Sequence, residues 1–162
     1  MPEPWKPPMP TIRTAIPADR EAILHLTERL GDFPVPPWRT AAEIARADHP
    51  ILLAALREPG VGHLLLVAEA GGRLLGFLFA AERADYFTGE RVAHVEDLAL
   101  DPGAEGKGLA RRLMEAAEQW ARERGCRRVT LNVWAQNERA IGLYRRLGYQ
   151  PETVHYLKEL SP

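Results

Sequence analysis

The sequence has little of what marks secreted, membrane-spanning or nucleic-acid-binding proteins. It contains one cysteine, Cys126, among 162 residues, so an intramolecular disulfide is impossible. Its 21 basic and 22 acidic side chains give a formal net charge of −1. No excess of positive charge is present to hold a nucleic-acid backbone or an anionic membrane surface. We therefore expect neither as a partner, and an anionic ligand would have to be bound by local geometry.

Long apolar runs are also missing. The longest, residues 51–56 and 64–68, are far too short to span a bilayer. The first ten residues, MPEPWKPPMP, are rich in proline and lack the apolar segment of a signal peptide. With only one cysteine, these features favour a cytoplasmic location. We expect an extended arm over residues 1–10, followed by one domain over residues 11–162.

Hydrophobic residues make up 46% of the chain and charged residues 27%, which is typical of a globular protein. Gly71-Gly72 separates two apolar runs and predicts a β-hairpin. Apolar spacing and Gly/Pro punctuation predict helices over 17–31, 41–47, 51–57, 108–124 and 138–147, with Pro50 interrupting the second. The same signals predict strands over 11–15, 63–70, 73–82, 92–100, 128–133 and 155–160. This order predicts the α/β class, with a mixed, mostly antiparallel sheet flanked by helices.

The segment from His94 to Arg112 has the features of an anion-binding site. A predicted strand is followed by Gly106-Lys107-Gly108, which leads into a predicted helix. Glycines let the backbone turn tightly and approach a ligand without a Cβ atom in the way. The first amides of a helix lack internal acceptors, and the helix dipole places partial positive charge there. Such a turn suits a pyrophosphate, although a tight turn without a ligand is the ordinary alternative.

Two common phosphate-binding motifs do not fit this segment. A P-loop needs a glycine five residues before Gly106-Lys107, where Asp101 stands, and a hydroxyl residue after the lysine, where Gly108 stands. A dinucleotide-binding fingerprint beginning at Gly106 needs a third glycine at position 111, which is Arg111. A nucleotide-hydrolysing protein is therefore disfavoured.

The run Glu105-Gly106-Lys107-Gly108-Leu109-Ala110 resembles the pyrophosphate loop of the GNAT superfamily of acyl-CoA-dependent N-acyltransferases, which reads Gln/Arg-x-x-Gly-x-Gly/Ala. The closing block of residues 131–149, with Asn132, Asn137, Leu143-Tyr144 and Leu147-Gly148-Tyr149, is similar to the end of the same family. The two motifs occur in the family's order. The resemblance implies an acetyl-CoA-dependent enzyme that transfers acetyl directly to a primary amine in a ternary complex. A non-catalytic acyl-CoA-binding or sensor domain is the alternative.

The resemblance implies a set of cofactor-binding residues. Their backbone or side-chain groups would hold acetyl-CoA: Leu98, Ala99, Leu100, Gly106, Lys107, Gly108, Leu109, Ala110, Arg111, Asn132 and Asn137. Each asparagine has an ordinary alternative role at the end of a strand or as a helix cap. Glu105 departs from the family, because a carboxylate cannot donate to a phosphate. Replacing Glu105 by Arg would then be expected to tighten CoA binding.

The resemblance also implies two catalytic residues. Glu96 would act as the base that takes a proton from the amine, often through water, with Asp97 or water itself as alternatives. Strand alternation places Glu96 with Leu98 on one face of the sheet and Asp97 on the other, unless a bulge intervenes. Tyr144 would protonate the departing sulfur, whereas its ordinary alternative is a packed aromatic on a helix.

Other partners are less defined by the sequence. The five histidines have no metal-ligand spacing, so no metal is expected, and His94 is a candidate to assist Glu96. We expect the acceptor to be a small-molecule or peptide amine, bound in a pocket built by residues 31–62 and 83–91. A peptide N-terminus, a lysine, a polyamine and an aminoglycoside all remain open. Family habit makes a homodimer through the C-terminal strand or the proline arm possible.

Overall fold

The computed structural model describes residues 1 and 8–161, and the chain divides into two compact units, residues 1–132 and 133–162. Most of the proline-rich arm predicted over residues 1–10 therefore lies outside the described residues. The first unit holds the sheet and the helices that cover it. The second unit holds one helix and the C-terminal tail.

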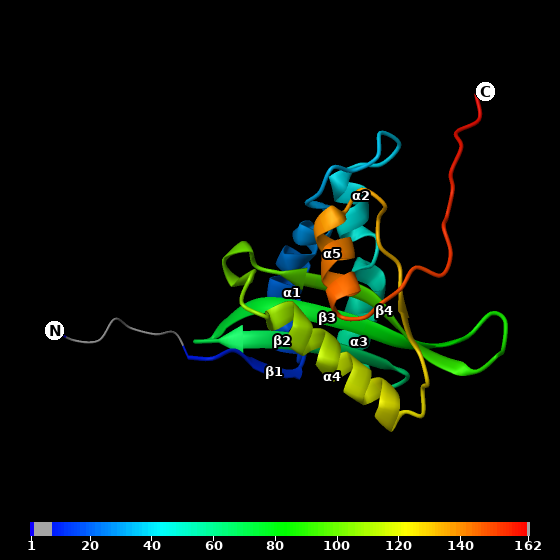
Figure 1. Cartoon of the computed structure of the whole chain (residues 1–162). Helices are drawn as coiled ribbons and strands as arrows, with labels where there is room; N and C mark the ends of the chain where they lie inside the picture. The colour runs from blue at the N-terminus through cyan, green and yellow to red at the C-terminus, as the bar shows by residue number, and fades with distance from the viewer. Residues whose placement is uncertain (2–7, 162) are drawn as a thin grey trace. The chain divides into compact units, whose positions relative to one another are not determined.

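The first unit is built on a five-stranded sheet in the order β1-β2-β3-β4-β5 (Figure 1). Its strands are β1 (Thr11–Thr14), β2 (His63–Ala70), β3 (Arg73–Ala84), β4 (Arg91–Leu100) and β5 (Val129–Leu131). Neighbours run antiparallel except β4 and β5, which are parallel. Gly71 and Gly72 join β2 to β3 with φ of 57° and 76°. Such a two-residue turn with both φ values positive matches the twist of the strands it connects.

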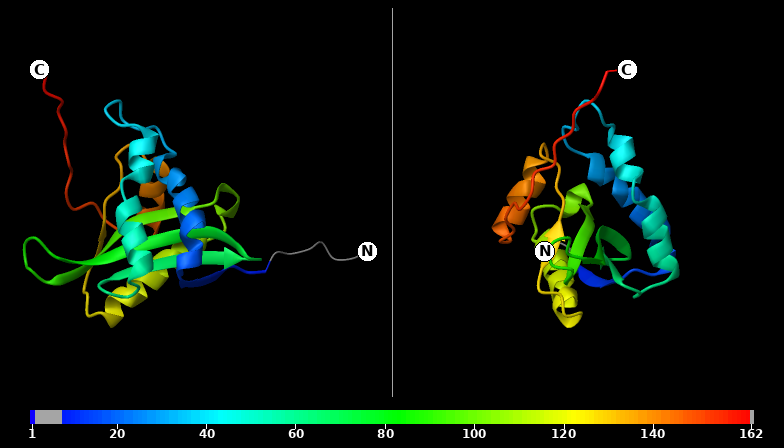
Figure 2. Two further views of the ribbon diagram at one scale, coloured as in Figure 1. Left: turned by 180° about the vertical axis from the view of Figure 1, so that it is seen from behind. Right: turned by 90° about the vertical axis from the view of Figure 1, so that its right-hand side faces the viewer.

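Helices cover both faces of this sheet, as Figure 2 shows. They are α1 (Arg20–Leu26), α2 (Ala41–Arg46), α3 (His49–Arg57) and α4 (Leu109–Glu123). The first three lie on one face and α4 lies on the other (Figure 2, right). Apolar spacing explains the docking of α4, because its buried residues Leu109, Leu113, Met114, Ala117 and Ala121 recur every three or four positions.

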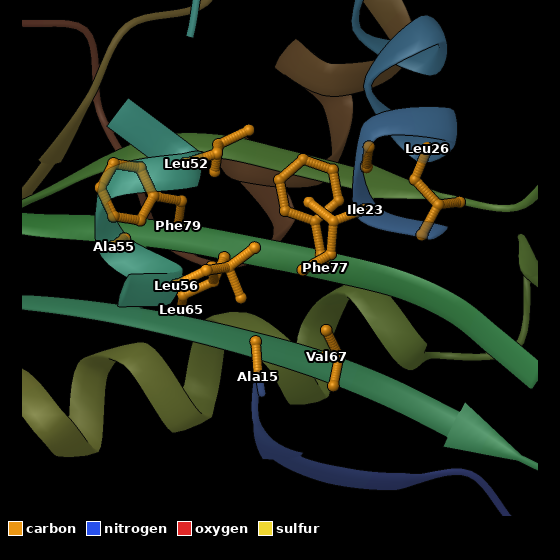
Figure 3. Close-up of a cluster of buried hydrophobic side chains, with 11 residues drawn as sticks. Ala15, Ile23, Leu26, Leu52, Ala55, Leu56, Leu65, Val67, Phe77 and Phe79 are labelled. Atoms are coloured by element: carbon orange, nitrogen blue, oxygen red, sulfur yellow. The ribbon is translucent and has the colours of Figure 1, made fainter. Parts of the chain in front are cut away.

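A hydrophobic cluster fills the space between the sheet and the helices α1 and α3 (Figure 3). Ile23 of α1, Leu52 of α3 and Phe77 of β3 are completely inaccessible to solvent. Burying each such side chain stabilises the fold by about 1.5–3 kcal/mol. Ala99 of β4 belongs to the same cluster, so the strand that precedes the glycine loop is fixed to the core.

Short 3-10 turns join these elements: η1 (Pro17–Asp19) and η2 (Thr27–Gly31) flank α1, and η3 (Pro102–Ala104) follows β4. The helix predicted over residues 17–31 is therefore a 3-10, α, 3-10 succession. Pro50 does not interrupt a helix, because it lies in the first turn of α3. Proline is tolerated there since the amide it lacks would have no intrahelical acceptor.

The second unit contains α5 (Glu138–Arg146), which Gly148 follows with a φ of 92°. Residues 149–161 have no regular secondary structure, and those from Gln150 onward are exposed. The strand predicted over residues 155–160 is therefore wrong. Alternating apolar residues are not enough, because a strand also needs a neighbouring strand to pair with.

The fold class predicted from the sequence, α/β with a mixed, mostly antiparallel sheet flanked by helices, is confirmed. In the part of the chain that the structure describes, none of the helices has the length and apolar character needed to cross a bilayer. The boundary placed at residue 11 stays a prediction.

Candidate active site

The strands β4 and β5 pair over three residues only, and the last pair is Val95 with Leu131. Beyond it β5 ends while β4 continues to Leu100. The amide of Asp101 donates to the carbonyl of Leu75 in β3 at 2.8 Å. Because amides alternate along a strand, those of Asp97 and Ala99 also point toward β3, while those of Leu98 and Leu100 point to the edge that β5 leaves. The amides of Leu98 and Leu100 are therefore two main-chain donors at the edge of β4 that is left unpaired where β5 ends.

A β-bulge at Glu96 changes which side chains share a face. Phe79 pairs with Asp97 and Ala80 pairs with Val95, so Glu96 has no counterpart in β3. His94, opposite Ala81, lies on the same face as Asp97, and Oε2 of Glu96 is 3.9 Å from Nε2 of His94. The bulge thus brings Glu96 to the face of His94 and Asp97. The prediction from simple alternation, which put Glu96 and Asp97 on opposite faces, is wrong.

Glu96 lies in a chain of polar contacts. Arg83 of β3 forms an ion pair with the Oε1 atom of Glu96, and only 14% of the Glu96 side chain is exposed. Nδ1 of the buried His94 is 2.8 Å from Oγ1 of Thr130. Burial holds the pKa of His94 below its ordinary value of 6.5, and Arg83 lowers it further against the opposing effect of Glu96. Near pH 7 the imidazole is therefore neutral and able to take up a proton beside Glu96.

Asp97 is the next residue and has a different environment. It is 5% exposed, and its carboxyl group is in hydrogen-bonding contact with the side chain of Asp48. Burial raises the pKa of Asp97 to about 8, and the nearby negative charges of Asp48 and Glu96 add to the effect. Its Oδ2 atom has no hydrogen-bond partner among the described residues. At neutral pH the carboxyl group is thus mostly protonated.

This raised pKa predicts a pH-dependent stability. Because the folded-state pKa of about 8 exceeds the ordinary 3.8, Asp97 stabilises the fold fully below about pH 4 and progressively less up to about pH 8. Asp97→Asn removes the ionisable group and therefore this loss of stability at higher pH. We expect the melting temperatures of variant and parent to agree near pH 4, and the variant to melt about 5 °C or more higher at pH 9. Calorimetric melting curves across this range test the expectation, and parallel curves would contradict it.

The glycine loop presents an open main-chain surface at the start of α4. Gly106 and Gly108 have φ of 72° and 76°, and a Cβ atom built on either would meet nothing within 4 Å. Gly108 caps α4, whose first turn has no acidic side chain. The amides of residues 109–111 have no intrahelical acceptor. The helix dipole places partial positive charge at these amides, and no carboxylate in the first turn competes for them, so the start of α4 suits an anion.

Glu105, the departure from the family pattern, is paired with a distant arginine. Nη2 of Arg29 is 2.6 Å from Oε1 of Glu105, and Nε of Arg29 donates to the carbonyl of Leu100 at 3.2 Å. Arg29 also forms an ion pair with Asp32. The guanidinium thus neutralises Glu105 and links η2, the end of β4 and the loop. Local sequence signals do not identify Arg29, which lies 76 residues before Glu105.

This pairing revises the prediction that Glu105→Arg tightens CoA binding, since the new guanidinium would face Arg29. We expect Arg29→Gln to weaken acetyl-CoA binding about tenfold, because it leaves a carboxylate unneutralised beside the loop. The double variant Arg29→Gln/Glu105→Gln should recover most of that loss. Isothermal calorimetry measures all three dissociation constants. Equal weakening in the single and double variants would argue against the neutralising role.

The remaining predicted residues lie in separate places. Asn132 is exposed after β5, and Arg111 is exposed with Nη1 3.8 Å from Glu115. Asn137 caps α5, where its side chain accepts from the amide of Ala140 at 3.2 Å. The ring of Tyr144 is 6.0 Å from that of Tyr149. Asn137 and Tyr144 belong to the second unit, and the other site residues belong to the first.

A cavity of about 560 Å³ is lined by charged groups that pair with one another, such as Arg13 with Asp19 and Arg73 with Asp101. Over the described residues, no group of three or more His, Cys, Asp or Glu side chains is arranged to hold a metal ion.

Comparisons with known proteins agree with this geometry. The model of the acetyltransferase (GNAT) family matches residues 23–149. The aminoglycoside N(6')-acetyltransferase type 1 of Stenotrophomonas maltophilia is 30% identical over 160 residues, covering 94% of this chain and 95% of the relative. The mycothiol acetyltransferase of Salinispora tropica is 36% identical over 167 residues and 99% of this chain, which spans about half of that relative, 51%.

A solved structure has the same fold. The aminoglycoside N-acetyltransferase AAC(6')-Iy in complex with CoA superposes with a TM-score of 0.71 at 23% identity, covering 96% of this chain and 97% of that one. The chain therefore belongs to the acetyltransferase (GNAT) family, and it is an N-acyltransferase.

Proposed function

We propose that this protein is an acetyl-CoA-dependent N-acetyltransferase that transfers acetyl directly to a primary amine of a small molecule or peptide. The observation that carries the proposal is the open turn of Gly106 and Gly108 at the start of α4. This turn belongs to the same unit as Glu96, which lies at the bulge of β4, the strand that leads to the turn. A relative named for aminoglycoside acetylation and a similar structure solved with CoA support it. We further propose a cytoplasmic enzyme with its catalytic domain over residues 11–162.

In this proposal the pyrophosphate of acetyl-CoA binds the amides of residues 106–110, and Arg111 adds positive charge from the exposed side of α4. The amides of Leu98 and Leu100 bind the pantetheine where β5 ends. The amide of Ala99 is turned toward β3 and its side chain is buried in the core cluster, so Ala99 contributes only the backbone path between Leu98 and Leu100. Asn132 and the amide group of Asn137 contact the cofactor from the segment between β5 and α5.

The transfer itself needs a base, a polarised carbonyl and an acid. An alkylamine with a pKa of about 10.4 arrives protonated, and Glu96 accepts that proton directly or through water, with the neutral His94 beside it. The amine nitrogen then attacks the thioester carbonyl carbon, whose oxygen is stabilised by a β4 amide. The carbon–sulfur bond breaks, Tyr144 protonates the departing thiolate, and the nitrogen gives its second proton to the tyrosine oxygen, which restores the phenol. The products are an acetamide and CoA.

The proposed acid role of Tyr144 makes a separate prediction. Tyr144→Phe removes the phenolic proton and keeps the ring, so kcat should fall about tenfold or more while the affinity for acetyl-CoA changes less than twofold. Single-turnover kinetics measure the chemical step. An unchanged rate in the variant would exclude this role, and a large loss of affinity would indicate packing instead.

The alternative is an acyl-CoA-binding or sensor domain without turnover, which Glu105 in place of Gln or Arg favours. Two measurements separate the functions. Calorimetric titration with acetyl-CoA should show binding, and release of the CoA thiol should follow when amines from a panel are added. Binding without release for every amine would favour the sensor. No binding at all would contradict both.

A further inference from the structure

Three carboxyl groups meet on one face of β4, on the side covered by α1 and α3. The bulge brings Glu96 to the face of Asp97, and the third group is that of Asp48, which precedes α3. Glu96 has Arg83 as a partner, whereas Asp48 and Asp97 contact each other. Two adjacent carboxyl groups repel one another when both are ionised, so the pair needs a proton or a cation.

Asp48 does not have the usual capping role of an aspartate at the start of a helix. It is the N-cap residue of α3, yet its side chain makes no capping hydrogen bond. Aspartate is favoured at this position because it normally accepts from the first amides of the helix. Here the half-buried carboxyl group contacts Asp97 instead. Capping therefore does not account for the pair.

Asp97 provides an independent observation. Only 5% of Asp97 is exposed to solvent, and its Oδ2 atom has no hydrogen-bond partner among the described residues. Leaving a buried polar atom unsatisfied costs about 1–3 kcal/mol. Native proteins keep few unsatisfied buried groups, because satisfied groups give a more stable fold. An unsatisfied group is therefore typical of a functional site, where a ligand supplies the missing partner.

We propose that Asp48 and Asp97 bind a second ammonium group of the acceptor, next to the amine that reacts at Glu96. The proposal rests on the proposed function and deepens it. An ammonium group has three donors, which match the oxygens of two adjacent carboxyl groups. Consecutive Cα atoms lie about 3.8 Å apart, so the two amino groups must be separated by only a few bonds. The acceptor is therefore a small diamine or polyamine, amino sugars with neighbouring amino groups included.

Matched substrates test this directly. The first probe is 1,3-diaminopropane, and 3-amino-1-propanol replaces its second ammonium by a hydroxyl of similar size. Glucosamine 6-phosphate represents anionic acceptors. We expect kcat/KM for the diamine to exceed that for the amino alcohol at least 30-fold at 0.15 M salt. Asp48→Asn and Asp97→Asn should each reduce this ratio to about threefold, while the exposed Glu58→Gln leaves it unchanged.

Proton release gives a second readout that a structural role would not change. Among the described residues, the ionisable groups on the face of Asp97 are Asp48 at the start of α3 and, on its own strand, Glu96 and the neutral His94. Phe79, opposite Asp97 in β3, is uncharged. An ammonium bound there lowers the pKa of Asp97 from about 8, so diamine binding at pH 7 should release a proton. Calorimetry in phosphate and in Tris buffer measures the release, and Asp97→Asn should abolish it.

The outcomes separate this inference from the proposed function. Equal kcat/KM for the two matched amines, or an unchanged ratio in both carboxamide variants, overturns the ammonium site while the enzyme remains an N-acetyltransferase. Preference for glucosamine 6-phosphate overturns it as well, as does acetyl-CoA binding without binding or turnover of either amine. Failure to bind acetyl-CoA contradicts the proposed function itself.

Discussion

Replacing Glu96 by Gln is expected to lower kcat about 10²- to 10³-fold at pH 7, the usual contribution of a positioned general base. The carboxamide keeps the size of the side chain but cannot accept the proton of the incoming ammonium. The side chain of Glu96 is 14% exposed and paired with Arg83, which holds the carboxylate in place at the bulge of β4. Acetyl-CoA affinity should change less than twofold, because the cofactor contacts main-chain amides.

The pH dependence of this variant sharpens the expectation. Without a base, only the amine that is already neutral in solution can attack. That fraction rises about tenfold per pH unit below the amine pKa of about 10.4. The rate of Glu96→Gln should therefore rise with this slope between pH 7 and 9. Rapid-quench measurement of acetyl transfer gives both values, with Glu58→Gln as the control. A kcat within threefold of the parent would show that Glu96 is not the base.

Replacing Gly108 by Val is expected to weaken acetyl-CoA binding about 30-fold or more. Gly108 has a φ of 76°, which costs a β-branched residue about 1–3 kcal/mol. The new side chain would also occupy the open space above the loop, where nothing lies within 4 Å. Both effects act on the amides at the start of α4, which we propose bind the pyrophosphate. Calorimetric titration gives the dissociation constant.

A matched control separates loss of the site from loss of stability. Gly72 in the β2–β3 hairpin has the same φ of 76° and equally open space around its Cβ position. Gly72→Val should therefore lower the melting temperature to a similar extent while leaving acetyl-CoA affinity within twofold. If both variants bound acetyl-CoA as tightly as the parent, the loop would not be the cofactor site.

The sequence predicted those features that depend on neighbouring residues. The Gly71-Gly72 hairpin, the amphipathic helix α4 and the glycine turn before it were all predicted from local signals, and each is present. Only glycine takes a φ near +75° readily, so the glycine positions fix the turns. Pro50 was misread because the same residue that ends one helix also begins another.

Features that join distant segments could not be predicted. The ion pair of Arg29 with Glu105 spans 76 residues, and the contact of Asp48 with Asp97 joins the start of α3 to β4. The bulge at Glu96 depends on the register of β4 against β3, which periodicity alone does not determine. Part of the candidate site, its charge neutralisation and its carboxyl pair, therefore became visible only in three dimensions.

The central claim is that main-chain donors of this loop and strand bind acetyl-CoA. Titration of the ¹⁵N-labelled protein with CoA, followed by amide resonances, tests it most directly. We expect saturable shifts that are largest at residues 106–110, with Leu98 and Leu100 shifting more than Ala99 between them. Shifts centred on other segments, or no saturable shift at millimolar CoA, would contradict it.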